Sequence, residues 1–292
     1  MALDPFPETK AIRLPDGRDF AWIEIGHPDG HPVMFFHGTP SSRLALRGEA
    51  TRIQACDVRL IAVDRPGYGL STFQPRRKLV DWPDDVARLA DHLGLDRLAV
   101  IGQSGGGPHA NVCARFLGDR ITVAGVTGGY CPLEPGRRVE QAETMSRLSA
   151  RAPWLARGIF AGVFFARDRW PEATKRAVQR VFPPADRPIL TRPDVWTDLF
   201  GRSSPAAAKA AAQDMAILGA DWGFRLEDIK VPVQVWHGTE DRNVPFSQGE
   251  YQARTIPDAT LHRLLGEGHL FLHDHLEEVL ASVTEPLTPT TS

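Results

Sequence analysis

Short, almost purely apolar runs alternate with helix-length stretches along most of this 292-residue chain. The apolar runs lie at 33–36, 60–63, 98–101, 121–126 and 231–236, and a run of mixed polarity lies at 260–265. We predict a strand at each run and helices over 82–93, 108–117 and 248–256, with an amphipathic helix after 268. Strands that are buried on both faces lose the alternation of apolar and polar residues. The pattern therefore predicts an α/β fold with a mostly parallel sheet covered by helices on both faces.

The pattern changes at the start and in the middle of the chain. Residues 10–14 and 20–26 flank turn-forming residues at 15–18, which predicts an antiparallel hairpin. From about residue 131 to 225 strand-like runs are missing and prolines divide the segment into short helical stretches. We therefore predict three parts: a first part of the α/β core over 1–130, an inserted helical cap over 131–225, and a second part of the core over 226–292.

Composition excludes several classes of protein. The chain has 34 basic and 36 acidic residues, whereas nucleic-acid-binding proteins usually carry a basic excess. Its apolar runs are far shorter than the roughly 18 residues of a membrane helix, and its first residues lack the apolar core of a secretory signal. The three cysteines are scattered, which favours free thiols over a disulfide framework or a zinc site. We expect a cytoplasmic protein that binds neither nucleic acid nor membrane.

The strongest chemical signal is the pentapeptide Gly102–Gly106, which reads GQSGG. It follows a predicted strand directly and precedes a predicted helix, the context in which G-x-S-x-G forms a nucleophile elbow. Glycines at this turn avoid side chains that would clash with the neighbouring strand and helix. A phosphate-binding loop is the alternative, but the spacing does not fit G-x-G-x-x-G. Ser104 is therefore the candidate nucleophile.

A serine nucleophile needs a base, and the base needs an acid that orients it. His269 follows the last predicted strand in a Gly-containing loop, and Asp241 follows the strand before it. The chain order Ser104, Asp241, His269 fits this architecture. Glu240 stands next to Asp241, so position alone leaves the acid ambiguous. His109 is a rival base, but it shares the helix that follows Ser104 and is expected to be a core residue.

The chain resembles α/β-hydrolase-fold enzymes with a helical cap over essentially its whole length. Four motifs in matching order carry the resemblance: His37-Gly38-Thr39-Pro40, Asp64–Ser71, the GQSGG elbow, and the Asp241/His269 pair. The resemblance implies that Ser104 is the nucleophile, His269 the general base and then acid, and Asp241 the orienting carboxylate.

The same resemblance implies an oxyanion hole made by the backbone N–H groups of Thr39 and Gly105. His37, Gly38, Gly102 and Gly106 would support these two loops. Gly105 opens a helix, whose N-terminal dipole favours developing negative charge. The 64–71 motif is expected to shape the neighbouring loop without taking part in the reaction. The resemblance implies neither a cofactor nor a metal.

Departures from related subfamilies narrow the chemistry. Haloalkane dehalogenases and epoxide hydrolases use aspartate as the nucleophile, where this chain has Ser104. We therefore expect a serine esterase or lactonase that acts on a small apolar ester through an acyl-enzyme. C–C bond hydrolysis or perhydrolysis by the same three residues is the alternative. A ligand-binding receptor or an inactive relative is the alternative from another class, and the oligomeric state stays open.

Two further patterns, one of aromatic residues and one of histidines, each allow a functional and a structural interpretation. The predicted cap holds ten of the chain's 21 Trp and Phe residues, which either line an apolar substrate cleft or pack the cap onto the core. These ten are Trp154, Phe160, Phe164, Phe165, Trp170, Phe182, Trp196, Phe200, Trp222 and Phe224. His269 and His273 stand four residues apart, as metal ligands on a helix do, but a solvated helix face is expected to account for His273 and His275.

Overall fold

The computed structural model describes residues 8–132, 141–193, 195–196 and 205–284. Within these ranges, eight strands form one sheet in the order β1-β2-β4-β3-β5-β6-β7-β8. The strands are β1 (Lys10–Arg13), β2 (Asp19–Gly26), β3 (His31–Phe36), β4 (Val58–Val63), β5 (Leu98–Gln103), β6 (Ile121–Thr127), β7 (Val233–Gly238) and β8 (Ala259–Leu264). Neighbouring strands from β4 to β8 run parallel, whereas β1 and β2 form the predicted antiparallel hairpin at one edge.

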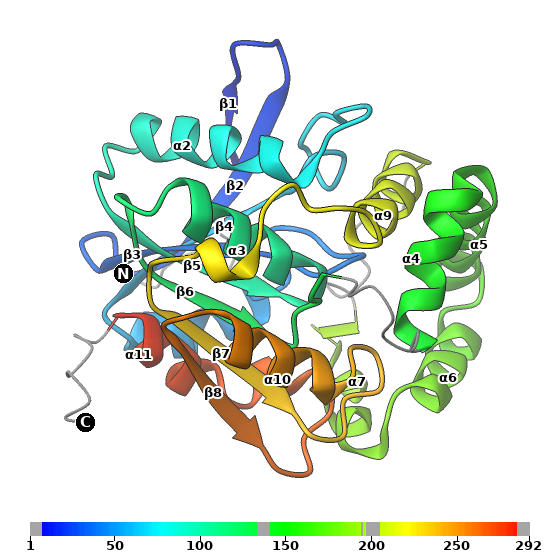
Figure 1. The fold of residues 1–292 in the computed structure, drawn as a ribbon. Helices are drawn as coiled ribbons and strands as arrows, with labels where there is room; N and C mark the ends of the chain where they lie inside the picture. Colours follow the sequence, from blue (N-terminus) through cyan, green and yellow to red (C-terminus); the bar gives the residue numbers. More distant parts are fainter. Residues whose placement is uncertain (1–7, 133–140, 194, 197–204, 285–292) are drawn as a thin grey trace.

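Helices cover both faces of this sheet (Figure 1). They are α1 (Ala50–Ala55), α2 (Trp82–His92), α3 (Gly107–Phe116), α10 (Phe246–Thr255) and α11 (Leu276–Thr284). Within one strand, Met34 packs into the apolar cluster under α2 and α3, whereas Phe35 packs into the cluster under α1 and α11. Successive strand residues point to opposite faces, so two buried faces require apolar residues at every position. This explains the near-continuous apolar runs in the sequence.

Most of the described residues between β6 and β7 are helical, and these helices lie together at one side of the sheet (Figure 1). They are α4 (Gln141–Arg151), α5 (Pro153–Arg169), α6 (Pro171–Val181), α7 (Arg187–Thr191) and α9 (Pro205–Leu218). Helix α9 packs against α4 and α5. We call this group of helices the cap. None of the helices that the structure describes combines the length and apolarity needed to span a bilayer.

The topology brings four loops to one edge of the sheet. Strands β3, β5, β7 and β8 run parallel, so the loops that follow Phe36, Gln103, Gly238 and Leu264 leave from their carboxyl ends on the same side. In open α/β sheets this edge is where ligands bind. The three candidate residues Ser104, Asp241 and His269 lie on these loops, as do the two candidate oxyanion-hole residues Thr39 and Gly105.

Candidate active site

Ser104 stands at the tight turn between β5 and α3. Its backbone φ is +52°, a left-handed conformation that is rare for a residue other than glycine. The turn is crowded, because a Cβ on Gly102 would lie 2.2 Å from the carbonyl oxygen of Gly106. A Cβ on Gly106 would lie 2.1 Å from the carbonyl oxygen of Phe36. The strained turn of a nucleophile elbow is therefore present, and the glycines make it possible.

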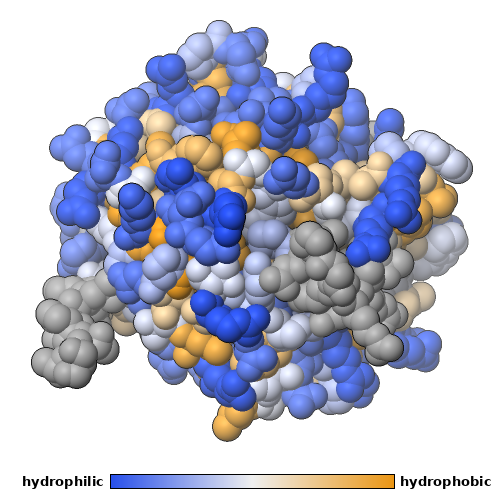
Figure 2. All heavy atoms as spheres, in the orientation of Figure 1, coloured by the Kyte–Doolittle hydropathy of each residue, from blue (hydrophilic) through white to orange (hydrophobic). Residues whose placement is uncertain are grey.

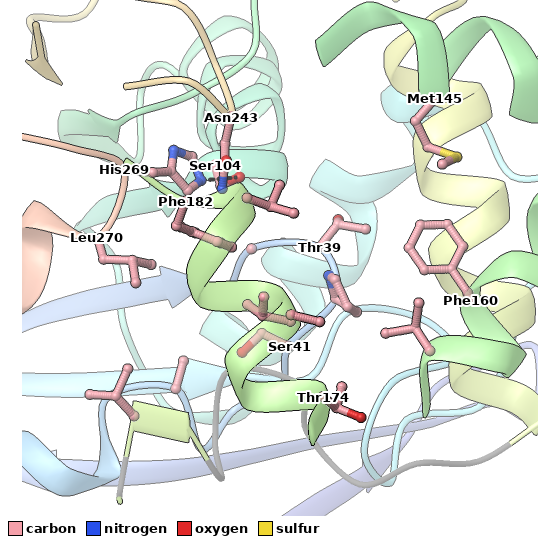
Figure 3. Close-up of a pocket in the computed structure, with 18 of the residues that line it drawn as sticks. Thr39, Ser41, Ser104, Met145, Phe160, Thr174, Phe182, Asn243, His269 and Leu270 are labelled. Atoms are coloured by element: carbon pink, nitrogen blue, oxygen red, sulfur yellow. Dashed lines mark hydrogen bonds between the residues drawn. The ribbon is translucent and has the colours of Figure 1, made fainter. Parts of the chain in front are cut away.

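His269 connects Ser104 to Asp241. Its Nε2 lies 3.0 Å from the Ser104 Oγ, and its Nδ1 lies 2.7 Å from the Asp241 Oδ2. The side chains of His269 and Asp241 are almost fully buried. Figure 3 shows Ser104 and His269 side by side at one end of a cavity. The three residues can pass a proton from the serine hydroxyl to an imidazole whose orientation is fixed by a carboxylate.

Both oxygens of Asp241 are occupied. Oδ1 accepts the backbone N–H groups of Asn243 and Val244 at 2.8 and 2.9 Å, which leaves Oδ2 for His269. His237 Nε2 lies 3.4 Å from that same Oδ2. The neighbouring Glu240 is exposed. The structure thus places Asp241, and not Glu240, against the histidine.

The buried pair has shifted pKa values in opposite directions. Burial acts to raise the pKa of Asp241, but the charge on His269 and hydrogen bonds from His237 and His269 outweigh it and hold the pKa well below its usual range. For His269, burial acts to lower the pKa, and the carboxylates of Asp241 and Asp186 raise it above its ordinary value. The arrangement therefore stabilises an imidazolium that forms when His269 takes a proton.

The loop after β3 lies directly against the elbow. A Cβ on Gly38 would lie 3.3 Å from the Ser104 Cβ, and a Cβ on Gly105 would lie 3.4 Å from the backbone nitrogen of Thr39. Gly105 is in the first turn of a helical segment, where a backbone N–H has no intrahelical acceptor. His37 is fully buried and hydrogen-bonds the Gly38 carbonyl at 2.7 Å. The two amides of Thr39 and Gly105 thus lie beside the serine.

A buried arginine, Arg65, hydrogen-bonds the loop that follows β3. Arg65 belongs to the 64–71 motif, is fully buried, and donates to the carbonyl oxygens of His37 and Gly38 at 3.0 Å each. It also donates to the Thr39 Oγ1 at 2.8 Å and pairs with Asp214 of cap helix α9. Asp214 also accepts a hydrogen bond from the hydroxyl of Tyr68, at 2.8 Å. The 64–71 motif therefore shapes the neighbouring loop, as expected.

A cavity of about 1120 Å³ lies between the sheet edge and the cap, with Ser104 and His269 in its wall. Its wall is mostly apolar and includes Met145, Phe160, Val163, Val178, Phe182 and Leu270. Figure 3 shows Phe182 on the side of Ser104 and His269, with Met145 and Phe160 across the cavity. The volume exceeds what a minimal ester needs and is large enough for a drug-sized molecule.

The ten Trp and Phe residues of the predicted cap do not share one environment: some line the cavity, some pack in apolar clusters, and some are exposed. Phe160, Trp170 and Phe182 line the cavity. Phe164, Trp196, Trp222 and Phe224 pack into apolar clusters. Trp154 and Phe165 on α5 are 75% and 63% exposed. Figure 2 shows hydrophobic surface over the cap, on the right of the view. Phe200 lies outside the described residues.

The remaining histidines differ in how well the sequence predicted them. His109 is fully buried with Nδ1 2.9 Å from the Gly105 carbonyl, which confirms that it is a core residue. The prediction of a solvated face was wrong for His273, which is buried in a tight turn with Nδ1 3.0 Å from Glu49. In the described part of the chain, no three His, Cys, Asp or Glu side chains form a metal-binding group.

The roles of three residues near the site were not predicted from the sequence. Arg65 and Asp214 hold the loop after β3, and Asp186 of the cap accepts hydrogen bonds from the backbone of the His269 loop. Each contact joins residues far apart in the chain, and neither aspartate lies in a motif. Only Arg65 carried a signal in the sequence, because it belongs to the 64–71 motif.

Comparison with known proteins agrees with this architecture. The model of the α/β hydrolase fold family matches residues 31–276. A non-heme chloroperoxidase of Streptomyces lividans is 28% identical over 279 residues, covering 91% of this chain and 95% of that protein. A bifunctional esterase/perhydrolase of Acinetobacter calcoaceticus is 25% identical, covering 86% and 89%.

Solved structures show the same fold. A hydrolase from Pseudomonas aeruginosa superposes with a TM-score of 0.72 at 20% identity, covering 95% of this chain and 98% of that one. The family model spans most of the chain, including the elbow and the loops that carry Asp241 and His269. The chain belongs to the α/β hydrolase fold family.

Proposed function

We propose that the protein is a serine hydrolase that cleaves carboxylic esters or lactones through an acyl-enzyme. The observation that carries the proposal is the hydrogen-bonded chain Ser104–His269–Asp241 in the wall of a largely apolar cavity. Ser104 provides the nucleophile, His269 the base, and Asp241 the carboxylate that orients the base.

The proposed reaction begins when the Ser104 Oγ attacks the ester carbonyl and its proton moves to the His269 Nε2. The carbonyl oxygen becomes an oxyanion that accepts hydrogen bonds from the backbone N–H groups of Thr39 and Gly105. His269 then gives its proton to the leaving alcohol oxygen as the C–O bond breaks. Water, deprotonated by His269, attacks the acyl-enzyme and releases the carboxylic acid.

Partition of the acyl group between water and methanol tests this mechanism. We expect p-nitrophenyl, phenyl and ethyl butyrate to give the same ratio of methyl butyrate to butyrate, because all three form the same acyl-enzyme. A ratio that changes with the leaving group would contradict a common covalent intermediate. No turnover of any ester by the folded protein would contradict the proposed function itself.

Chain-length preference is predicted from the cavity. A medium-chain acyl group can bury its methylenes against the apolar wall, and each contributes about 0.8 kcal/mol, or roughly fourfold in kcat/KM. We therefore expect kcat/KM for p-nitrophenyl esters to rise from acetate to hexanoate. A steady fall from acetate upward would count against an apolar acyl site.

Filling the cavity provides a matched test of the same site. Ala177 on α6 lines the cavity, so Ala177→Phe should move the preferred acyl chain toward shorter lengths. Ala161 on α5 is exposed and outside the cavity wall, so Ala161→Phe should leave the preference unchanged. Equal effects of the two substitutions would mean that the acyl chain does not lie along α6.

Perhydrolysis is a second candidate, supported by the name of one relative, the bifunctional esterase/perhydrolase. Hydrogen peroxide would replace water as the nucleophile that attacks the acyl-enzyme, with His269 again taking the proton. The products would be a peracid and free Ser104. Peracid formation from butyrate ester and peroxide, measured against butyrate release, decides between the two outcomes.

A further inference from the structure

The cap reaches the reactive histidine through one buried side chain, Asp186. This residue ends the short helical turn Pro184–Asp186 between α6 and α7 and is fully buried. Its Oδ2 accepts the backbone N–H of His269 at 2.9 Å, and its Oδ1 accepts the backbone N–H of Leu270 at 2.8 Å. One carboxylate thus holds two successive amides of the loop that carries the proposed base. Hydrogen bonds to a charged acceptor are stronger than neutral ones.

The loop is shaped to receive this carboxylate. A Cβ on Gly268 would lie 2.3 Å from the Asp186 Oδ1, and the three atoms nearest to it all belong to the Asp186 carboxyl group. From the sheet, a Cβ on Gly238 at the end of β7 would lie 2.3 Å from the carbonyl oxygen of Gly268. The loop is therefore clamped between the sheet edge and the cap, and the cap side of the clamp is Asp186.

Packing joins this clamp to the substrate cavity. Leu270 is buried in a small apolar cluster with Ile189, Leu190 and Val195 of the cap, and it also lines the cavity. Phe182, four residues before Asp186, packs against the same cluster and lines the cavity near Ser104 (Figure 3). The cap segment that shapes the substrate site is thus the segment that holds the histidine loop.

We propose that Asp186 is a positioning residue that couples the cap to His269, fixing the histidine backbone while Asp241 fixes its ring. The inference rests on the proposed function, because it assigns His269 the role of base. Asp186 touches no reacting atom and acts through His269. A cap displaced from the loop would withdraw the carboxylate from the His269 backbone, while Asp241 would still hold the ring.

The charge of Asp186 distinguishes its role as a positioning residue from that of a contact that only stabilises the loop. Within the described residues, His269 hydrogen-bonds Asp241 after β7, Ser104 at the elbow and Asp186 from the cap. Other titratable groups nearby are Tyr130, Arg242 and His273 in the cavity wall and His237 beside Asp241. Both carboxylates raise the pKa of His269. The histidine must be neutral to act as a base, so kcat/KM rises with pH through this pKa. Removing the charge of Asp186 should therefore move the acid limb to lower pH.

The first experiment compares Asp186→Asn with Glu172→Gln, which removes an exposed cap carboxylate. We expect Asp186→Asn to lower kcat about tenfold to a hundredfold, with KM changed much less, since a displacement of about 1 Å at the base costs rate. We expect its acid limb to move down by about half a pH unit or more. Glu172→Gln should match wild type in both. An unshifted acid limb in Asp186→Asn would overturn the proposal.

A double-substitution cycle tests the contact directly. Gly268→Ala places a methyl group on the Asp186 carboxyl and should lower kcat about tenfold or more. In an Asp186→Ala background the methyl group has room, so the same glycine substitution should cost less than about threefold. Equal costs in the two backgrounds would show that Gly268 and Asp186 act independently and would overturn the proposal.

NMR titration of the His269 ring separates this inference from the proposed function. The ring C–H resonance reports the pKa of His269 whether or not an ester is turned over. We expect Asp186→Asn to lower that pKa and Glu172→Gln to leave it unchanged. A wild-type protein without esterase activity would refute the proposed function, and the NMR shift would still decide whether Asp186 acts on His269. Identical titration curves would refute the inference even in an active esterase.

Discussion

Ser104→Ala is expected to lower kcat for ester hydrolysis by a factor of about 10⁶, the scale of loss when the nucleophile of a serine hydrolase is removed. The substitution deletes only the hydroxyl that lies 3.0 Å from His269 Nε2. Alanine meets the same backbone strain at φ +52° as serine does, so the thermal unfolding midpoint should change little. Kinetics with p-nitrophenyl butyrate and calorimetry on the same preparation measure both quantities.

The control for this substitution is Ser247→Ala, on the exposed side of α10. It should retain wild-type activity. A Ser104→Ala protein that keeps more than a few per cent of the wild-type kcat would show that another group acts as the nucleophile. A large fall in the unfolding midpoint would instead indicate that the loss comes from folding.

Asp241→Asn is expected to lower kcat by about 10³ to 10⁴ near neutral pH. The reason lies in the two oxygens of the carboxylate. Oδ1 accepts the backbone N–H groups of Asn243 and Val244, so an asparagine there keeps its oxygen on that side. Its NH₂ group then faces His269 Nδ1 and favours the tautomer with the proton on Nε2. That proton points at Ser104, so Nε2 cannot accept the proton of the serine hydroxyl.

Glu240→Gln is the matched control, because Glu240 is adjacent in sequence but exposed. It should cost less than about tenfold in kcat. Both variants should be measured on one activated ester from pH 6 to 9. If Glu240→Gln is the inactive variant, the assignment of the acid is wrong, and if neither variant is impaired, the acid lies elsewhere in the fold.

Much of the core architecture was predictable because its physical causes are local. Runs such as 98–101 are apolar at every position, as a strand covered on both faces requires, and Gly102 of the elbow is needed for a close contact with Gly106, four residues away. The order of strands along the sheet follows from long-range pairing and was not predicted. Local patterns predict the secondary structure of a segment, but they predict poorly which other segments pack against it.

The cap was the least predictable part. Apolar residues on α5 such as Trp154 and Phe165 are exposed, so helical spacing did not reveal which side chains face the cavity. Asp186 and Asp214 look like ordinary surface aspartates in the sequence but are fully buried. Their burial depends on donors from distant loops, Asp214 meeting Arg65 and Asp186 meeting the amide of His269. No local pattern encodes such contacts.

Covalent labelling with a fluorophosphonate tests the central claim most directly, since this reagent reacts with a serine that an adjacent base activates. Peptide mass spectrometry of the folded protein should find one adduct, on Ser104, with loss of esterase activity in proportion to labelling. The Asp241→Asn protein should label far more slowly, and Ser104→Ala should not label. A folded wild-type protein that carries no adduct, or carries it on another serine, would contradict the account.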